Sequence, residues 1–107
     1  MWGTAIPLEF ARVSPAQPIQ RYVLTPHALR EAARRGILLS VIADVLARPE
    51  QRQTVRPGRV VLQARRATGW PKKVYLVRVI VDIDREPAEV VTVYRTSRIA
   101  KYWESES

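Results

Sequence analysis

The stretch that decides the fold is VVTVYRTSRIAKYW, residues Val90–Trp103. It begins with β-branched residues, which favour a strand, and then becomes polar, basic and aromatic. A strand that only filled a core would not need the five polar side chains that gather here, namely Tyr94, Arg95, Thr96, Ser97 and Lys101. We therefore predict a structural strand that runs directly into a functional edge, with the rest of the chain as its support.

Composition narrows the class of protein. A chain of 107 residues predicts one small domain, and the absence of cysteine excludes disulfides and thiolate chemistry. No apolar run has the length of a membrane span, and the first residues lack the features of a signal peptide, so we expect a cytoplasmic protein without membrane contact. The formal net charge of +8, carried mostly by arginine, indicates a polyanionic partner, nucleic acid first, unless the arginines are simply a solvated surface.

Two helices are expected early in the chain. Thr25 and Pro26 are typical of a helix start, and Gly36 marks the end of a helix that runs to about Arg35. Its core face is predicted to hold Leu29, Ala32 and Ala33, and the opposite face a row of His27, Arg30 and Arg34.

A second helix is predicted from Ser40 as N-cap to the region of Pro49, with an apolar stripe of Val41, Ile42, Val45 and Leu46. The two helices should form a compact hairpin with one apolar seam. A DNA-binding helix-turn-helix is a poor alternative, because the second helix offers few side chains that could read bases.

From Gln53 onward the apolar period changes to two, which predicts strands. The expected strands are Gln53–Arg56, Val60–Arg66, Lys73–Ile83 and Glu89–Ser97, and residues 98–103 form a closing turn or short helix. The fold class is therefore α+β, with an N-terminal helix pair packed on an antiparallel sheet of about four strands. This single domain spans residues 22–103, after a proline-containing extended lead-in (1–21) and before a short tail (104–107).

Side-chain alternation assigns the faces of the sheet. The helices are expected to cover the face that carries Val60, Leu62, Ala64, Tyr75, Val77, Val79, Val81, Val91 and Val93. The opposite, open face would then carry Gln63, Arg65, Arg78, Thr92, Tyr94 and Thr96. A one-residue bulge would exchange these sets.

An open face with arginines, a tyrosine and hydroxyls suits a phosphodiester. Metal-free RNA cleavage needs a base for the 2′-hydroxyl, an acid for the leaving oxygen, and cations for the negative charge. His27, the only histidine, or Tyr94 could transfer protons, and Arg30, Arg78 or Arg95 could supply charge. The structural alternative is that a histidine in a first helical turn is a surface residue and that a strand tyrosine packs.

Other sites are poorly supported by the sequence. Asp82 and Asp84 share a strand face but have no histidine or cysteine beside them, so we expect no metal site and no cofactor. No glycine-rich phosphate loop, Walker pattern or nucleophile elbow is present.

Two blocks, TPHALREAARRGI (Thr25–Ile37) and VVTVYRTSRIAKYW, resemble a family of small bacterial domains of unassigned function that is grouped with RelE- and BrnT-type ribonuclease toxins. The resemblance covers roughly Tyr22–Trp103. It implies a RelE-like fold with a curved antiparallel sheet, metal-independent RNA cleavage, and an antitoxin as partner. By position, His27 and Arg30 match the helix motif, and Tyr94, Arg95, Thr96 and Ser97 match the closing motif.

The leading hypothesis is therefore a toxin-type RNA endonuclease that acts on RNA and is held by an antitoxin. Its candidate catalytic residues are His27, Arg30, Tyr94, Thr96 and Ser97. Its candidate RNA-binding residues are Arg34, Arg65, Arg78, Arg95 and Lys101. The alternatives are a non-catalytic RNA- or protein-binding module and a structural accessory domain. The nuclease hypothesis requires that the helix of His27 begins within reach of Tyr94.

Overall fold

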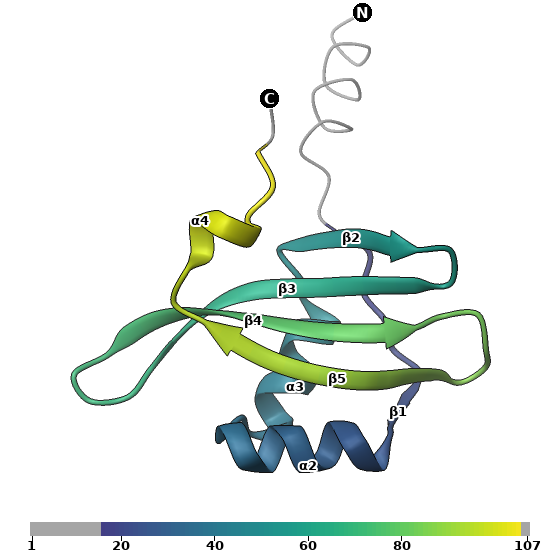
Figure 1. Cartoon of the computed structure of the whole chain (residues 1–107), viewed down its shortest axis with the longest axis horizontal. Helices are drawn as coiled ribbons and strands as arrows, with labels where there is room; N and C mark the ends of the chain where they lie inside the picture. The colour runs from purple at the N-terminus through teal and green to yellow at the C-terminus, as the bar shows by residue number, and fades with distance from the viewer. Residues whose placement is uncertain (1–15, 106–107) are drawn as a thin grey trace, which may run out of the picture.

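The computed structural model describes residues 16–105, so residues 1–15 of the expected lead-in and residues 106–107 of the expected tail lie outside it. The elements in order are β1 (Tyr22–Leu24), α2 (Pro26–Arg35), α3 (Leu39–Ala47), β2 (Gln51–Arg56), β3 (Arg59–Thr68), β4 (Lys73–Asp82), β5 (Ala88–Thr96) and α4 (Ile99–Tyr102). The strands form one sheet in the order β1-β5-β4-β3-β2 (Figure 1). None of the helices in the described part of the chain combines the length and apolar character needed to cross a bilayer.

Helix α2 has the predicted bounds, because its two ends are set by local chemistry. The Thr25 hydroxyl accepts a hydrogen bond from the Ala28 N–H at 3.1 Å, and Gly36 closes the helix at φ 67°. The predicted core face is partly wrong. Ala28 and Ala32 are buried, whereas Leu29 is 44% exposed. Small side chains at the contact let the helix backbone lie close to β5, and Leu29 falls on its flank.

The cap of α2 gives a first stability test. Thr25→Ala is expected to lower the free energy of unfolding by about 1 kcal/mol, because the Ala28 N–H loses its acceptor. Urea denaturation measures the change, and Thr25→Ser should retain most of the stability because it keeps the hydroxyl. Equal stability of the alanine variant and the wild type would contradict the assigned cap.

Helix α3 begins at Leu39, with Leu38 at the N-cap and no side-chain hydrogen bond there, so the prediction of Ser40 as N-cap is wrong. The apolar stripe is buried as expected at Ile42, Val45 and Leu46. The two helices contact different strands, α2 mainly β5, and α3 β3 and β4. The predicted helix hairpin with a single seam is therefore not how they pack.

The sheet also differs from the predicted four strands. Strand β1 precedes the helices and pairs in parallel with β5, so the sheet is mixed and has five strands. The described helices include α4 at the opposite end of the chain, so the expected N-terminal pair packed on the sheet is not the whole arrangement. A three-residue strand is too short to carry a periodic pattern, and its partner lies more than sixty residues away in the sequence.

The main core lies between the sheet and helices α2 and α3, on the face that was predicted for it. Its strand members are Val60, Leu62, Ala64, Val77, Val79, Val81, Ala88, Val90 and Val93. Val91 was predicted there, but the register shifts beside Ile80, and Val90 lies opposite Val81 instead. This irregularity leaves Val91 half-buried while Val90 packs in the core.

Candidate nucleic-acid interface

Polar side chains form one row across four strands on the face opposite to α2 and α3. Strand register places Gln51 beside Gln63, Gln63 beside Arg78, and Arg78 beside Tyr94. Arg78 Nη1 donates to the Tyr94 hydroxyl at 2.7 Å, and its Nη2 donates to Gln53 Oε1 at 3.2 Å. The structure thus brings together two residues that the sequence assigned to different roles, Arg78 for RNA binding and Tyr94 for catalysis.

The sequence predicted an open face here, and this prediction is wrong, because the C-terminal segment covers this part of the sheet. The Tyr102 carbonyl accepts hydrogen bonds from the amides of Gln53 and Gln63, each at 3.1 Å. The centroid of the Tyr102 ring lies 4.3 Å from the Arg78 guanidinium carbon and 6.1 Å from the centroid of the Tyr94 ring. Gln63 is fully buried and Arg78 only 8% exposed. Alternation within the strands could not reveal this cover, since it comes from a later segment.

Two further contacts hold the C-terminal segment against the sheet. The Arg65 guanidinium lies 4.2 Å from the Trp103 ring centroid and is ion-paired with Glu50 at 2.8 Å. Gln51 donates to the Glu104 carbonyl at 2.8 Å and accepts from the Glu104 N–H at 3.0 Å. Arg65, a predicted RNA contact, is therefore already engaged with a carboxylate.

Tyr94 lies in an environment that keeps its phenol protonated. Burial raises the pKa of Tyr94 above its usual value, and the charge of Arg78 beside it only partly opposes this effect. At neutral pH the phenol is therefore a proton donor rather than a base. In chemical terms the Arg78–Tyr94 pair can bind an anion and give it a proton.

His27 lies on the other side of the sheet. The Thr25 N–H donates to the Val90 carbonyl at 3.0 Å, so α2 begins beside Val90 in the first half of β5. Tyr94 is four residues further along this strand, which is about 13 Å at the usual rise per residue. Helix α2 packs on the helix-covered face, whereas Tyr94 contacts Tyr102 on the opposite face. His27 and Arg30 are exposed. The structure therefore does not bring the imidazole and the phenol together at one anion.

The closing motif is split between the two faces by strand alternation. Arg95 pairs in register with Val77 and lies on the helix-covered side, where its guanidinium carbon is 4.9 Å from the Tyr75 ring centroid. There it lines a mostly apolar cavity of about 130 Å³. The Thr96 hydroxyl accepts from the Arg98 N–H at 3.0 Å and so stabilises the turn into α4, and Ser97 is exposed.

Arg34 is also engaged within the protein. Glu31 accepts from Arg34 at 2.8 Å and from Arg35 at 3.0 Å on the exposed side of α2. The hydrogen bond from Arg34 is the largest of the effects that lower the pKa of Glu31 to about 2. Arg34 therefore belongs to a local ion-pair cluster, away from the row of Arg78 and Tyr94.

The Glu31 cluster predicts a pH dependence of stability. Because the pKa of Glu31 is lowered from 4.5 to about 2 on folding, its contribution is complete above about pH 5 and disappears as the pH falls toward 2. Glu31→Gln should therefore be less stable than wild type at pH 7, and most of this difference should be gone at pH 2, close to the pKa of the folded state. Urea midpoints at pH 7, 4 and 2 measure this, and a stability difference that stays constant with pH would contradict the assignment.

Unpaired positive charge gathers toward one end of the sheet, which we call the basic end: the β3–β4 loop, residues 73–78 of β4, and residues 95–101. Residues 67–81 and 90–103 contain no Asp or Glu. Within the described residues, six cations of this region form no ion pair with a carboxylate, namely Lys72, Lys73, Arg78, Arg95, Arg98 and Lys101. Trp70, at the tip of the β3–β4 loop, is 94% exposed.

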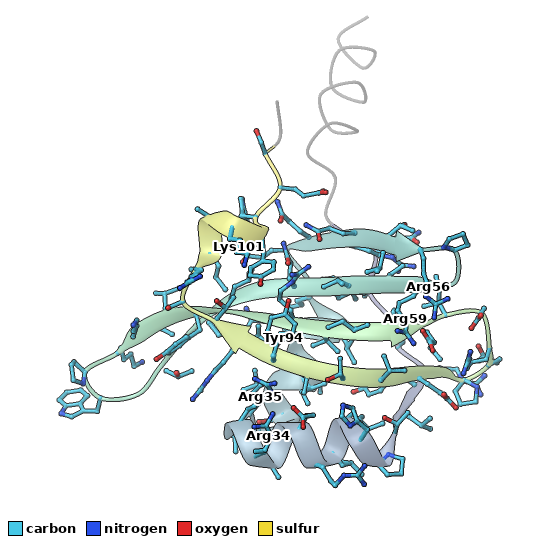
Figure 2. The ribbon with its side chains drawn as sticks, in the orientation of Figure 1. Arg34, Arg35, Arg56, Arg59, Tyr94 and Lys101 are labelled. Carbon is cyan, nitrogen blue, oxygen red and sulfur yellow. The ribbon has the colours of Figure 1, made fainter. Side chains whose placement is uncertain are left out.

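The other end of the sheet is neutralised. The carboxylates Asp82, Asp84, Glu86 and Glu89 lie there, and they pair with Arg59, Arg85 and Arg21. Figure 2 shows Lys101 and Tyr94 toward the basic end and Arg56 and Arg59 toward the other. Sequence reasoning missed Lys72, Lys73 and Arg98, although the two stretches without acidic residues were a usable signal.

Comparison with protein families gives a match over most of the described chain. The model of a family described as a domain of unknown function, DUF4258, matches residues 24–95. The chain belongs to the DUF4258 family. No curated protein matches the chain, and no solved structure does. Nothing in these comparisons links this DUF4258 domain to RelE- or BrnT-type toxins.

The matched region of this DUF4258 domain contains Gln53, Gln63, Arg78 and Tyr94, and it ends before the covering helix α4. Within residues 16–105, no three His, Cys, Asp or Glu side chains are grouped so that they could hold a metal ion. Asp82, which the sequence analysis considered for that role, is paired with Arg59 at 2.6 Å.

Proposed function

We propose that this DUF4258 domain is an RNA-binding module of the cytoplasm that holds single-stranded RNA at its basic end. The observation that carries the proposal is the set of six cations there that form no ion pair with a carboxylate of residues 16–105. Arginine and lysine bind phosphate oxygens, and an exposed aromatic ring such as Trp70 can stack on a base. Cations and an exposed aromatic group that gather at one end of the sheet, here from both of its faces, are a combination that suits single-stranded nucleic acid.

The pattern of ion pairing supports the basic end over the rest of the surface. An arginine that already has a carboxylate partner must give up that contact before it binds phosphate, as Arg59 and Arg85 would. The cations of the basic end have no such contact to lose. In the part of the chain that the structure describes, Arg30, Arg52 and Arg56 also form no ion pair with a carboxylate, but they belong to α2 and β2 and not to the basic end.

The proposal predicts binding that depends strongly on salt. If the six cations each contact one phosphate, the logarithm of the association constant should fall with the logarithm of salt concentration with a slope of about −4. Fluorescence anisotropy of a labelled single-stranded RNA, measured across a KCl series, gives this slope. Affinity that is the same at every salt concentration would refute phosphate-mediated binding.

A second candidate is metal-independent RNA cleavage by a toxin-type domain of RelE-like fold, with an antitoxin as partner, in a form that gives no role to His27 because His27 lies on the other side of the sheet from Tyr94. The hydrogen bond between Arg78 and Tyr94 favours it, since it joins a cation to a phenol that can donate a proton. The RNA 2′-oxygen would bond to phosphorus and lose its proton to water. The bond to the 5′-oxygen would break, and that oxygen would take the proton of Tyr94 while Arg78 neutralises the phosphate.

Cleavage is tested by incubating RNA with the protein in the presence of EDTA. If the domain cleaves RNA, Tyr94→Phe should lower the rate by at least a hundredfold, because the general acid is lost. His27→Ala should leave the rate unchanged, because His27 lies on the other side of the sheet. RNA that stays intact at high protein concentration would exclude the second candidate and leave the binding role alone.

A further inference from the structure

Arg78 carries a buried positive charge and forms no ion pair with any acidic side chain of residues 16–105. It is 8% exposed, and its hydrogen bonds go to a tyrosine hydroxyl and a glutamine amide oxygen, both neutral. Its Nε–H has no hydrogen-bond partner within the described residues. Burial of an unpaired charge is strongly unfavourable, so buried cations in folded proteins are normally paired. A bound anion beside Arg78 would therefore lower the cost of burying its charge.

Tyr102 covers this part of the row: the centroid of its ring lies 4.3 Å from the Arg78 guanidinium carbon, and its carbonyl oxygen is bound by the side chains beside Arg78. Two amide groups, from Gln53 and Gln63, both donate to this one oxygen at 3.1 Å. Two converging donors beside a guanidinium are an arrangement that suits an oxygen of an anion. Gln63 Oε1 also has no hydrogen-bond partner among the described residues. Two buried atoms of the polar row, Arg78 Nε and Gln63 Oε1, are therefore without a hydrogen bond there. The Tyr102 carbonyl oxygen thus occupies the position that an oxygen of a bound anion could take.

The segment that supplies this carbonyl is held by side-chain contacts and not by strand pairing. Helix α4 has four residues, none of them buried, and no side-chain hydrogen bond at its N-cap. Its contacts with the sheet involve the amide groups of Gln51, Gln53 and Gln63 and the stacking of the Tyr102 and Trp103 rings on Arg78 and Arg65. Residues 99–104 can therefore leave the sheet without breaking any strand pairing.

We propose that Arg78, Gln53 and Gln63 form a binding site for one phosphate group, which the segment Ile99–Glu104 covers in the free protein. The Tyr94 hydroxyl, already bonded to Arg78, is a further donor at the edge of this site. The identification of RNA as the source of the phosphate rests on the proposed function. Binding exchanges the Tyr102 carbonyl for a phosphate oxygen, and so couples the release of the C-terminal segment to the occupation of the site.

The Nε–H signal of Arg78 in nitrogen-15 NMR spectra of the full chain reports on the site directly. Inorganic phosphate and a short oligouridine are added in separate titrations. We expect both to shift this signal, and the amide signals of residues 99–104 to sharpen as the segment is released. Trp103→Ala, which removes the ring over Arg65 but no site residue, should tighten phosphate binding several-fold.

The outcomes separate this inference from the proposed function. If RNA binds and neither ligand moves the Arg78 signal, the phosphate site is wrong while RNA binding stands. If phosphate moves the signal and RNA does not bind, the site stands and the proposed function falls. Arg78→Lys keeps the charge but loses the planar fork, so the amide signals of residues 99–104 should no longer sharpen when phosphate is added, while thermal unfolding shows whether the variant still folds.

Discussion

Replacement of Lys72, Lys73, Arg98 and Lys101 together by alanine is expected to weaken RNA binding by about a hundredfold at physiological salt. None of the four has a carboxylate partner among the described residues. Each is free to contact phosphate, and each contact adds to the release of counterions. The same variant should lower the magnitude of the salt slope by about 3. Fluorescence anisotropy with a labelled single-stranded RNA measures both effects.

A matched variant separates position from net charge. Arg21, Arg34, Arg48 and Arg85 are each paired with a carboxylate, and their replacement by glutamine also removes four positive charges. We expect this variant to retain most of the affinity. Equal losses in the two variants would mean that RNA responds to the overall charge of +8 and not to the basic end. Circular dichroism spectra of both variants serve as the control that they still fold.

Leu62→Ala is expected to lower the free energy of unfolding by about 3 kcal/mol. Leu62 is fully buried in β3, and it packs in the core between the sheet and the helices. Removal of its branched end leaves a cavity that rigid neighbouring strands cannot close. Urea denaturation measures the loss.

The control for Leu62 lies on the adjacent strand. Val55 in β2 is 56% exposed, so Val55→Ala should change the free energy of unfolding by no more than about 0.5 kcal/mol. A Leu62→Ala variant that is as stable as Val55→Ala would contradict the assignment of the helix-covered face. That assignment also fixes which side of the sheet carries Arg78 and Tyr94.

The parts of the fold that were predictable are those with local causes. Helix α2 follows from the cap at Thr25 and the glycine at position 36, and the covered face of β3 follows from alternation along residues 60–64. Strand β1 and the irregular pairing beside Ile80 depend on partners that are distant in the sequence. Local patterns carry no information about such pairings, and so these features were missed.

For the candidate site too, the sequence predicted only what depends on local alternation, namely which side chains share a face of the sheet. Alternation placed Gln63, Arg78 and Tyr94 on one face, and the register aligns them. The same alternation conflicted with a shared site for His27 and Tyr94, since it placed the helices under the valine face and Tyr94 on the other. The cover by Tyr102 could not be predicted, because an apolar and aromatic tail fits a core, a partner or a sheet face equally well.

The amide signals that shift when single-stranded RNA is added to nitrogen-15-labelled protein test the location of RNA binding most directly. We expect the shifts to lie at the basic end, in residues 68–75 and 94–103, with little change at residues 82–89 or in α2. Shifts centred on α2 around His27, or spread evenly over all basic residues, would contradict binding at the basic end.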